Sequence, residues 1–288
     1  MKKFDIAIIG GDRRTACMAQ VFQEKGLRTI SYGTVTLPKS PPACRADSLQ
    51  DAVSASHILV FGIPFQKNDY LFFQESMPLV SLAELKRCLR KHHHIFGGII
   101  PETFRHHCET REISCYDFMT DESLTIFNAI ATAEGAIAEA LLHKDTNLHH
   151  SRCLVLGYGR CGKVLADKLR GLNAHVTVCS RNLQELSLAD SLGMDTLSLS
   201  ALCPEICHFE YIFNTIPSKI LTEDCLQCLS SGTLIIDIAS GAGGVDSDAA
   251  ARHDITVLHC PGLPGKYAGY SSAKRLAEYV LEKAAPCA

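Results

Sequence analysis

The sequence predicts an α/β protein with two doubly wound parallel-sheet domains. Apolar runs of strand length alternate with helical patterns along the 288 residues, and this alternation is typical of parallel strands joined by crossover helices. An alanine-rich stretch without proline, residues 121–143, interrupts the alternation, which restarts at residue 153. We therefore expect a long linker helix between the two domains. A last helical pattern follows the final strand, so we expect a C-terminal helix that crosses back to the first domain.

The first half of the chain contains the elements of an N-terminal α/β domain, residues 1–118. Period and composition predict strands over residues 4–9, 28–31, 57–62 and 95–100, and helices over residues 15–25 and 81–91. Three prolines in residues 34–45 predict a loop. The helix over residues 121–143 is then the main part of a linker, residues 119–150.

The second half contains the elements of another α/β domain, residues 151–265. We expect strands over residues 153–156, 175–179, 211–214, 233–238 and 255–259, and helices over residues 161–171, 182–192, 222–229 and 246–252. Apolar residues at helical spacing predict the crossover helix over residues 271–283, within a C-terminal segment of residues 266–288.

Composition describes an ordinary globular chain. Apolar residues make up 47% of it, charged residues 20%, and 28 basic against 31 acidic side chains give a net charge of −3. This weak acidity gives no electrostatic reason to expect nucleic acid or an anionic membrane as a partner. The apolar runs are of strand length, so we expect no membrane span and a cytoplasmic protein. We expect the 14 cysteines to be free thiols, mostly buried.

A glycine-rich turn follows the strand over residues 153–156. The sequence Gly157-Tyr158-Gly159-Arg160-Cys161-Gly162 joins that strand to a helix, and this context makes the G-x-G-x-x-G pattern specific for a dinucleotide. Gly157 permits the tight turn, Gly159 lets the backbone approach a diphosphate, and Gly162 lets helix and strand pack closely. The helix N-terminus attracts phosphate. We therefore expect both sheets to be Rossmann-like, with the nucleotide bound to the second.

The end of the next strand indicates which nicotinamide dinucleotide binds. NAD enzymes usually place an acidic residue there, which bonds the ribose hydroxyls and repels a 2′-phosphate. This chain has Ser180, Arg181 and Asn182 instead. Because serine and arginine donate hydrogen bonds to phosphate, NADP is favoured over NAD. The alternative is that Arg181 is a solvated arginine at a strand end.

The following strands also end in polar turns. Ligands of parallel sheets bind at the carboxyl ends of the strands, so we expect these turns to flank the nicotinamide and the substrate. The expected contributors are Asn214, Thr215, Ile216, Pro217, Ala239 and Ser240.

Positively charged residues at two places in the sequence, an arginine pair and a lysine, are candidates for binding carboxylates. Arg13 and Arg14 follow the first strand at a glycine turn that lacks the third glycine of the fingerprint, so they suit carboxylates better than a second dinucleotide. The alternative is a capping turn with exposed arginines. Lys266 follows the last strand and precedes the crossover helix, where we expect it to face the substrate.

The linker helix carries one carboxylate in an apolar stripe. Glu134 shares the heptad spacing of the apolar residues, with Asn128 and Thr132 on an adjoining polar edge. A buried carboxylate needs a partner, a shifted pKa or a catalytic role. We therefore expect Glu134 to remove a proton from the substrate, or to hold Asn128 and Lys266 in place, beside an inter-domain cleft. The alternative is a structural glutamate paired with a neighbouring cation.

Neighbouring histidines and the pair Cys225 and Cys228 are not taken as metal sites. Adjacent histidines point in different directions, and the cysteine pair has no second pair at matching distance, so we expect no metal.

Several of these motifs together resemble the family formed by the A subunit of dipicolinate synthase. The resemblance runs over nearly the whole chain and includes the glycine turns and the Asn-Thr-Ile-Pro segment. Its specific parts are the Thr-Ala-Glu-Gly-Ala-Ile segment, which begins at Thr132, and the Pro-Gly-Leu-Pro-Gly-Lys segment, which ends at Lys266.

The resemblance implies a reaction and a partner. It implies NADP-dependent oxidation of 4-hydroxy-tetrahydrodipicolinate, or of dihydrodipicolinate, to dipicolinate during sporulation, on a branch of the lysine pathway. The implied partner is a flavoprotein-like B subunit, and a homo-oligomer is compatible with the resemblance. Two alternatives stay open. One is another NADP-dependent dehydrogenase of a shikimate-like or hydroxy acid. The other is a non-catalytic subunit that only binds the cofactor.

Overall fold

A computed structural model describes residues 4–37, 44–75 and 79–284 of the chain. Its contacts divide it into two compact units, the first of residues 1–125 with 268–288 and the second of residues 126–267. The domain boundaries expected at residues 118, 150 and 265 stay predictions; the division observed here falls inside the long helix α5 (Glu122–His143) and just before the C-terminal helix.

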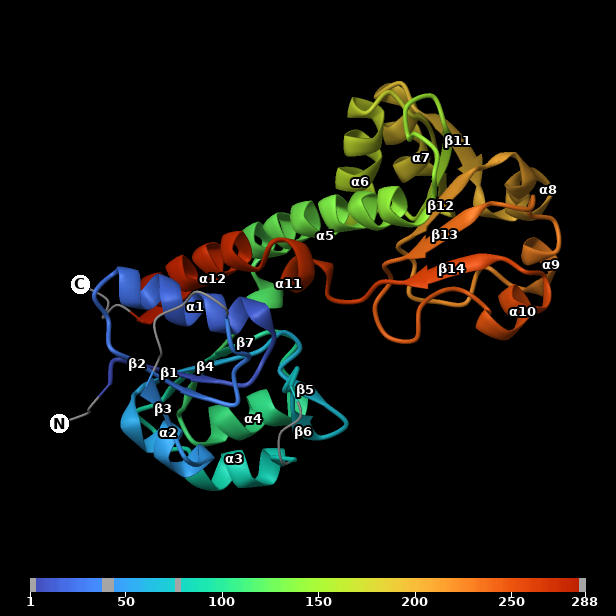
Figure 1. Cartoon of the computed structure of the whole chain (residues 1–288). Helices are drawn as coiled ribbons and strands as arrows, with labels where there is room; N and C mark the ends of the chain where they lie inside the picture. Colours follow the sequence, from blue (N-terminus) through green and yellow to red (C-terminus); the bar gives the residue numbers. More distant parts are fainter. Residues whose placement is uncertain (1–3, 38–43, 76–78, 285–288) are drawn as a thin grey trace. The chain divides into compact units, whose positions relative to one another are not determined.

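Unit 1 contains a six-stranded parallel sheet. Its strands run in the order β3-β2-β1-β4-β7-β8, so β1 lies near the middle and the chain winds outward in both directions (Figure 1). The strands are β1 (Ile6–Ile9), β2 (Thr29–Tyr32), β3 (Cys44–Arg45), β4 (Ile58–Phe61), β7 (His94–Gly97) and β8 (Ser114–Asp117). A short hairpin, β5 (Gln66–Lys67) with β6 (Tyr70–Leu71), lies outside the sheet.

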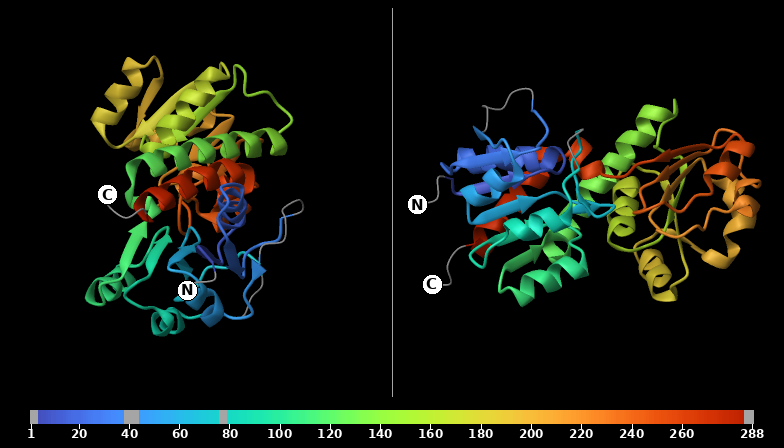
Figure 2. Two further views of the ribbon diagram at one scale, coloured as in Figure 1. Left: turned by 90° about the vertical axis from the view of Figure 1, so that its left-hand side faces the viewer. Right: turned by 90° about the horizontal axis from the view of Figure 1, so that it is seen from below.

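Helices cover both faces of this sheet because its central strands are apolar on both sides. Ile6 and Ile8 face α1 (Arg13–Glu24) and α12 (Gly269–Ala284), whereas Ala7 and Ile9 face the opposite layer. That layer consists of α2 (Leu49–Ala55), α3 (Leu82–Cys88) and α4 (Glu102–Thr110). Figure 2 shows α12 running alongside α1. The predicted return of the C-terminal helix to the first domain is thereby confirmed.

Unit 2 repeats the same topology. Its strands run in the order β11-β10-β9-β12-β13-β14, which is again the doubly wound 3-2-1-4-5-6 order. They are β9 (Arg152–Leu156), β10 (His175–Ser180), β11 (Asp195–Ser198), β12 (Tyr211–Asn214), β13 (Leu234–Asp237) and β14 (Thr256–His259). The winding direction reverses between β9 and β12, the place where open parallel sheets bind ligands. The predicted two-sheet Rossmann-like fold is therefore confirmed.

Two apolar layers enclose the second sheet. One contains part of α5, with α6 (Arg160–Gly171), α7 (Leu183–Ser191) and α11 (Leu263–Tyr267). The other contains α8 (Leu202–Glu205), α9 (Glu223–Leu226) and α10 (Ser247–Arg252), with short 3₁₀ turns before and after α8. Val155 and Phe213 point into the first layer, and Leu154 and Ile212 into the second. Burying one such side chain fully stabilises the fold by about 1.5–3 kcal/mol.

Some short elements were not predicted. The sequence pattern does not predict α2, α4, α8, α11, β5, β6, β8 or β11, and it predicts a loop where Cys44 and Arg45 form β3. The three prolines of that loop lie outside the described residues. Of the nine residues of α4, only Phe104 and Cys108 are buried, so the helix shows no apolar period. Edge strand β11 has no fully buried residue, so it lacks a strand pattern as well.

Helix α5 is longer than the strand-length apolar runs on which the expectation about membranes rested. It is the one helix in the described ranges that is long and apolar enough to cross a bilayer by length and composition. However, 56% of its apolar window is buried inside the protein, and Ala133, Ala136 and Ala140 pack on the second sheet. The helix therefore has the character of a core helix.

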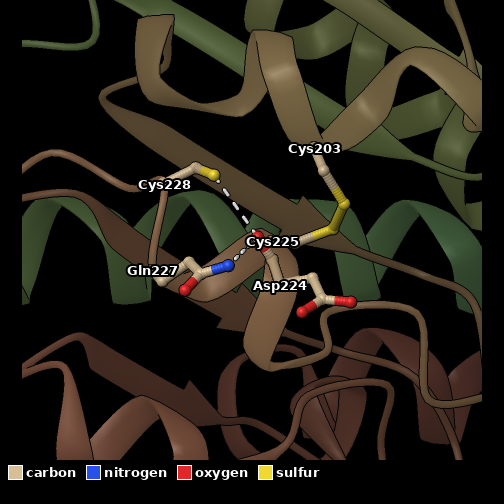
Figure 3. The surroundings of a disulfide bond; sticks show 5 residues. All are labelled: Cys203, Asp224, Cys225, Gln227 and Cys228. Atoms are coloured by element: carbon tan, nitrogen blue, oxygen red, sulfur yellow. Dashed lines mark hydrogen bonds between the residues drawn. A yellow bond between two sulfur atoms is a disulfide. The ribbon is translucent and has the colours of Figure 1, made fainter.

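The expectation that all cysteines are free thiols was wrong for one pair. Figure 3 shows a disulfide between Cys203 of α8 and Cys225 of α9, while Cys228 instead donates a hydrogen bond to the backbone oxygen of Asp224. The spacing of Cys225 and Cys228 therefore does not mark a bonded pair. The other eleven cysteines of the described residues are free, but only Cys17, Cys108, Cys153 and Cys179 are buried, so the expectation that the thiols are mostly buried was wrong. At Cys179, burial raises the pKa of the thiol to about 12.

Candidate functional site

The glycine turn between β9 and α6 has the geometry of a phosphate cradle. Gly157 adopts a φ of +88°, which only glycine adopts without strain. A Cβ on Gly162 would lie 2.1 Å from the backbone oxygen of Gly157, so this glycine is required for strand and helix to pack. A Cβ on Gly159 would meet nothing within 4 Å. Protein packing therefore does not require Gly159, whereas a ligand approaching the backbone would.

The N-terminus of α6 is open as well. Gly159 is its N-cap residue and supplies no side-chain hydrogen bond, and the first turn contains no acidic residue. The first N–H groups of a helix have no partner within the helix, and the helix dipole makes this end positive. The turn can therefore bind an anion.

A cavity of about 460 Å³ lies over this turn, at the carboxyl ends of β9, β10 and β12. Nine of the predicted cofactor residues line it: Gly157, Tyr158, Gly159, Ser180, Arg181, Asn182, Thr215, Ile216 and Pro217. Four further residues of its wall were not predicted: Glu185, Leu199, Ser218 and Ile220. The cavity lies at the switch point of the sheet, which is where a dinucleotide binds in this topology.

Five predicted cofactor residues do not line the cavity: Arg160, Cys161, Gly162, Asn214 and Ala239. Asn214 is fully buried, and its amide binds both the backbone N–H and the backbone oxygen of Ile216. It also donates to the Asp237 carboxylate at 2.9 Å. Asp237 in turn accepts from the backbone N–H groups of Ala239 and Gly244. Asn214 and Asp237 therefore shape the turns around the cavity rather than line it.

Ser180 does not have the role that the sequence predicted. Its hydroxyl donates a 2.6 Å hydrogen bond to the Glu185 carboxylate and accepts one from the Asn182 N–H. A hydroxyl has one proton, so this geometry leaves none for a phosphate. Arg181, in contrast, is exposed, and within the described ranges its guanidinium forms no ion pair. The pattern of Asn182 as N-cap and Glu185 three residues later is a common feature of helix starts.

The buried carboxylate of helix α5 is Glu139 rather than Glu134. The Glu134 side chain is 56% exposed and forms an ion pair with Lys168 at 2.9 Å. It therefore does not hold Asn128 or Lys266, and the expectation of a buried Glu134 was wrong. The Glu139 side chain is 5% exposed and forms an ion pair with Lys266. The sequence pattern does not single out Glu139 because α5 is rich in apolar residues on every side.

Helix packing explains how Lys266 reaches Glu139. A Cβ on Gly135 would lie 2.8 Å from the Cβ of Leu263, so this glycine allows α11 to pack closely against α5. One turn further along α5 is Glu139, and three residues after Leu263 is Lys266. Burial by itself would raise the pKa of Glu139, but hydrogen bonds from Lys266 and Tyr267 outweigh it and lower that pKa. The bond to Glu139 raises the pKa of Lys266.

Thr132, on the predicted polar edge of α5, has its hydrogen-bond partners inside the protein. The Thr132 hydroxyl donates to the backbone oxygen of Asn128 at 2.8 Å. Thr132 also contacts Cys161 in the first turn of α6; burial raises the pKa of that thiol and outweighs the lowering effects of Arg160 and of the Thr132 contact. Thr132 thus joins α5 to the glycine turn. Ser240 is exposed beyond the end of β13.

The two arginines of the first glycine turn have different environments. Arg14 is buried, and its guanidinium binds the Asp12 carboxylate and the backbone oxygen of Ile63. Its role is structural, so the expectation that it binds a substrate was wrong. Arg13 is exposed, and its backbone N–H donates to Gln74. Asp12 is the N-cap of α1, and its carboxylate accepts from the Arg14 N–H.

Metal ligands do not gather in the residues that the structure describes. Among these residues, no three histidine, cysteine, aspartate or glutamate side chains lie in an arrangement that could hold a metal ion.

Comparison with known proteins points to one family. Residues 5–119 match the family described as the N-terminal domain of the A subunit of dipicolinate synthase. The A subunit of dipicolinate synthase from Bacillus subtilis (strain 168) is 36% identical over 162 residues, which are 56% of this chain and 54% of that protein. The chain thus aligns with about half the length of this curated relative.

Two solved structures are similar over more of the chain. The A subunit of dipicolinate synthase from Bacillus halodurans has a TM-score of 0.85 and 25% identity, and the match covers 99% of both chains. The A chain of dipicolinate synthase from Bacillus subtilis has a TM-score of 0.78 and 27% identity, and the match covers 98% of this chain and 96% of that one. This chain is therefore similar to the A subunit of dipicolinate synthase, in sequence over residues 5–119 and in fold over nearly its whole length.

Proposed function

We propose that this chain is an NADP-dependent oxidoreductase that converts 4-hydroxy-tetrahydrodipicolinate, or dihydrodipicolinate, into dipicolinate. The observation that carries the proposal is the open glycine turn at Gly159 under a 460 Å³ cavity. The family supports the identity of the substrate. We further propose a cytoplasmic location and, as the family name indicates, a partner in the form of a second subunit. A flavoprotein-like B subunit, a role in sporulation and a homo-oligomer also belong to this proposal.

The residues of the cavity fit a nicotinamide dinucleotide. The N–H groups at Gly159 and the first turn of α6 would bind the diphosphate. Arg181 would pair with a 2′-phosphate, and this pairing supports NADP over NAD. Thr215, Ile216 and Pro217, held by Asn214, would contact the ribose and nicotinamide half. When bound, such a dinucleotide supplies the hydride acceptor that oxidation of the ring needs.

Binding of the substrate needs cations for two carboxylates. Arg13 and Lys266 stay our proposals for this role because both side chains are exposed, with the Lys266 ammonium held by Glu139. Asn128 and Ser240 stay proposals as polar contacts. Glu134 loses its support as the base, since Lys168 pairs with it. Forming an aromatic ring is downhill, so positioning of the ring should contribute more than a base.

A pair of glycine variants tests dinucleotide binding. Gly159→Ala adds a methyl group where the protein leaves open space, so the fold should keep its stability while the diphosphate is pushed away. We expect affinity for NADP to fall at least about tenfold, which is about 1.4 kcal/mol. Gly171→Ala, at the other end of the same helix and also in open space, is the matched control. Calorimetric titration of both variants measures the effect. Equal affinity in Gly159→Ala and the wild type would contradict the proposal.

The reaction itself is tested by absorbance. Purified chain, with and without the B subunit, is mixed with NADP and the cyclic lysine precursor, and NADPH formation is followed. The proposal predicts NADPH together with dipicolinate. Dinucleotide binding without any turnover in either mixture would instead indicate a subunit that only binds the cofactor. Turnover of a shikimate-like or hydroxy acid alone would indicate a different dehydrogenase.

A further inference from the structure

The wall of the dinucleotide cavity contains one carboxylate, and its surroundings give it a defined role. Glu185 lies in the first turn of α7 and lines the cavity together with Ser180 and Arg181. Its oxygen Oε2 accepts the Ser180 hydroxyl at 2.6 Å. Among the described residues Ser180 is its only side-chain partner, so Oε1 is free to accept another hydrogen bond.

Ser180 orients this carboxylate. The serine is buried at the end of β10, and its hydroxyl oxygen also accepts the Asn182 N–H at 3.1 Å. The backbone thus holds the oxygen, and the single proton points to Glu185. A ligand at the end of β10 therefore meets an acceptor, although the residue at that position is a serine.

The two forms of the cofactor differ at the atoms that would meet this acceptor. A ribose 2′-hydroxyl donates a hydrogen bond, which a carboxylate accepts strongly. A 2′-phosphate has only acceptor oxygens and carries a charge of about −1.5 to −2, so a carboxylate repels it. Arg181 acts in the opposite direction, because its exposed guanidinium attracts the phosphate.

We propose that Glu185 is a specificity-determining residue of the cavity and favours NAD, in opposition to Arg181, which favours NADP. Its carboxylate accepts the ribose hydroxyls of NAD and withholds the Ser180 proton from the 2′-phosphate of NADP. The preference for NADP then rests on Arg181 alone, and the chain also binds NAD. This inference rests on the proposed dinucleotide binding. It assigns to Glu185 the role of the acidic residue that NAD enzymes have at the end of the strand corresponding to β10.

Calorimetric titrations of the full chain with NADP and with NAD test the inference. Glu185→Gln keeps the size of the side chain and removes its charge. It should tighten NADP binding by about tenfold, which corresponds to about 1.4 kcal/mol, and weaken NAD binding by about threefold. Glu185→Ala should change the ratio of the two affinities in the same direction. Arg181→Ala should change it in the opposite direction.

Glu205→Gln is the matched control because Glu205 is an exposed glutamate of the same unit, outside the cavity. It should leave both affinities unchanged. If the ratio of NADP to NAD affinity differs less than about twofold between Glu185→Gln and the wild type, the role of Glu185 is overturned and the proposed function is not. A wild-type chain that binds neither dinucleotide would overturn both this inference and the proposed function.

Discussion

The two residues of the ion pair between Lys266 and Glu139 differ in burial, and this difference decides what each contributes to the stability of the fold. The Glu139 side chain is 5% exposed, whereas the Lys266 side chain is 59% exposed. A buried charge without a partner is costly, but an exposed ammonium is solvated by water. Removing the lysine therefore leaves the more costly group behind. Lys266 serves the fold as the partner of a buried carboxylate, whatever else it binds.

Lys266→Met should destabilise the protein more than Glu139→Gln does at pH 8. We expect about 2 kcal/mol for the first and less than about 1 kcal/mol for the second, since only the first leaves a buried charge without its main partner. Urea unfolding measures both. A larger loss in Glu139→Gln would contradict this account of the pair.

The same pair has a pH dependence with a defined sign. In the wild type the folded state lowers the pKa of Glu139, so its contribution is present above the unfolded value of about 4.3 and is lost as the pH falls through the lowered folded value. In Lys266→Met only the Tyr267 hydrogen bond and the nearby His143 oppose the effect of burial, so we expect the pKa of Glu139 to rise. The loss of stability in this variant should therefore shrink as the pH falls from 8 to 5.

Short elements around the cavity depend on a covalent link. Helices α8 and α9 have four residues each, too few to be stable alone, and the disulfide joins them (Figure 3). The cavity residue Leu199 lies just before α8, and the cavity segment 215–220 lies just before α9. The disulfide thus holds the parts of the chain behind two walls of the cavity.

Reduction of the disulfide should destabilise unit 2. The bond closes a loop with a sequence separation of 22, for which the loss of chain entropy predicts a contribution of about 3 kcal/mol. Thermal unfolding of the wild type with and without a dithiol reductant measures this contribution. Cys203→Ser should unfold at the lower temperature in both conditions, and Cys207→Ser, which keeps the bond, should respond like the wild type. A Cys203→Ser variant that still responds to the reductant would show that another bond is responsible.

At the scale of the whole chain, the sequence predicted the sheets better than it predicted the site. Central strands such as β9 and β12 are continuous apolar runs, and the glycine spacing after β9 has one interpretation. Polar roles were harder to predict. Ser180 binds Glu185 five residues away, but Lys266 binds Glu139 over a separation of 127 residues, so only packing could show the second pair.

The two sheets share one strand order, and the residues at their first turns can be compared one by one. Gly10, Gly11 and Asp12 in unit 1 occupy the places of Gly157, Tyr158 and Gly159 in unit 2. The amino end of α1 thus already holds an anion of its own, the Asp12 carboxylate, neutralised by Arg14. The phosphates of a coenzyme would have to displace the Asp12 carboxylate, which is part of the chain, from this helix end. In the described residues the two units therefore share one scaffold but differ at this helix start, which a carboxylate occupies in unit 1 and which has no side-chain cap in unit 2.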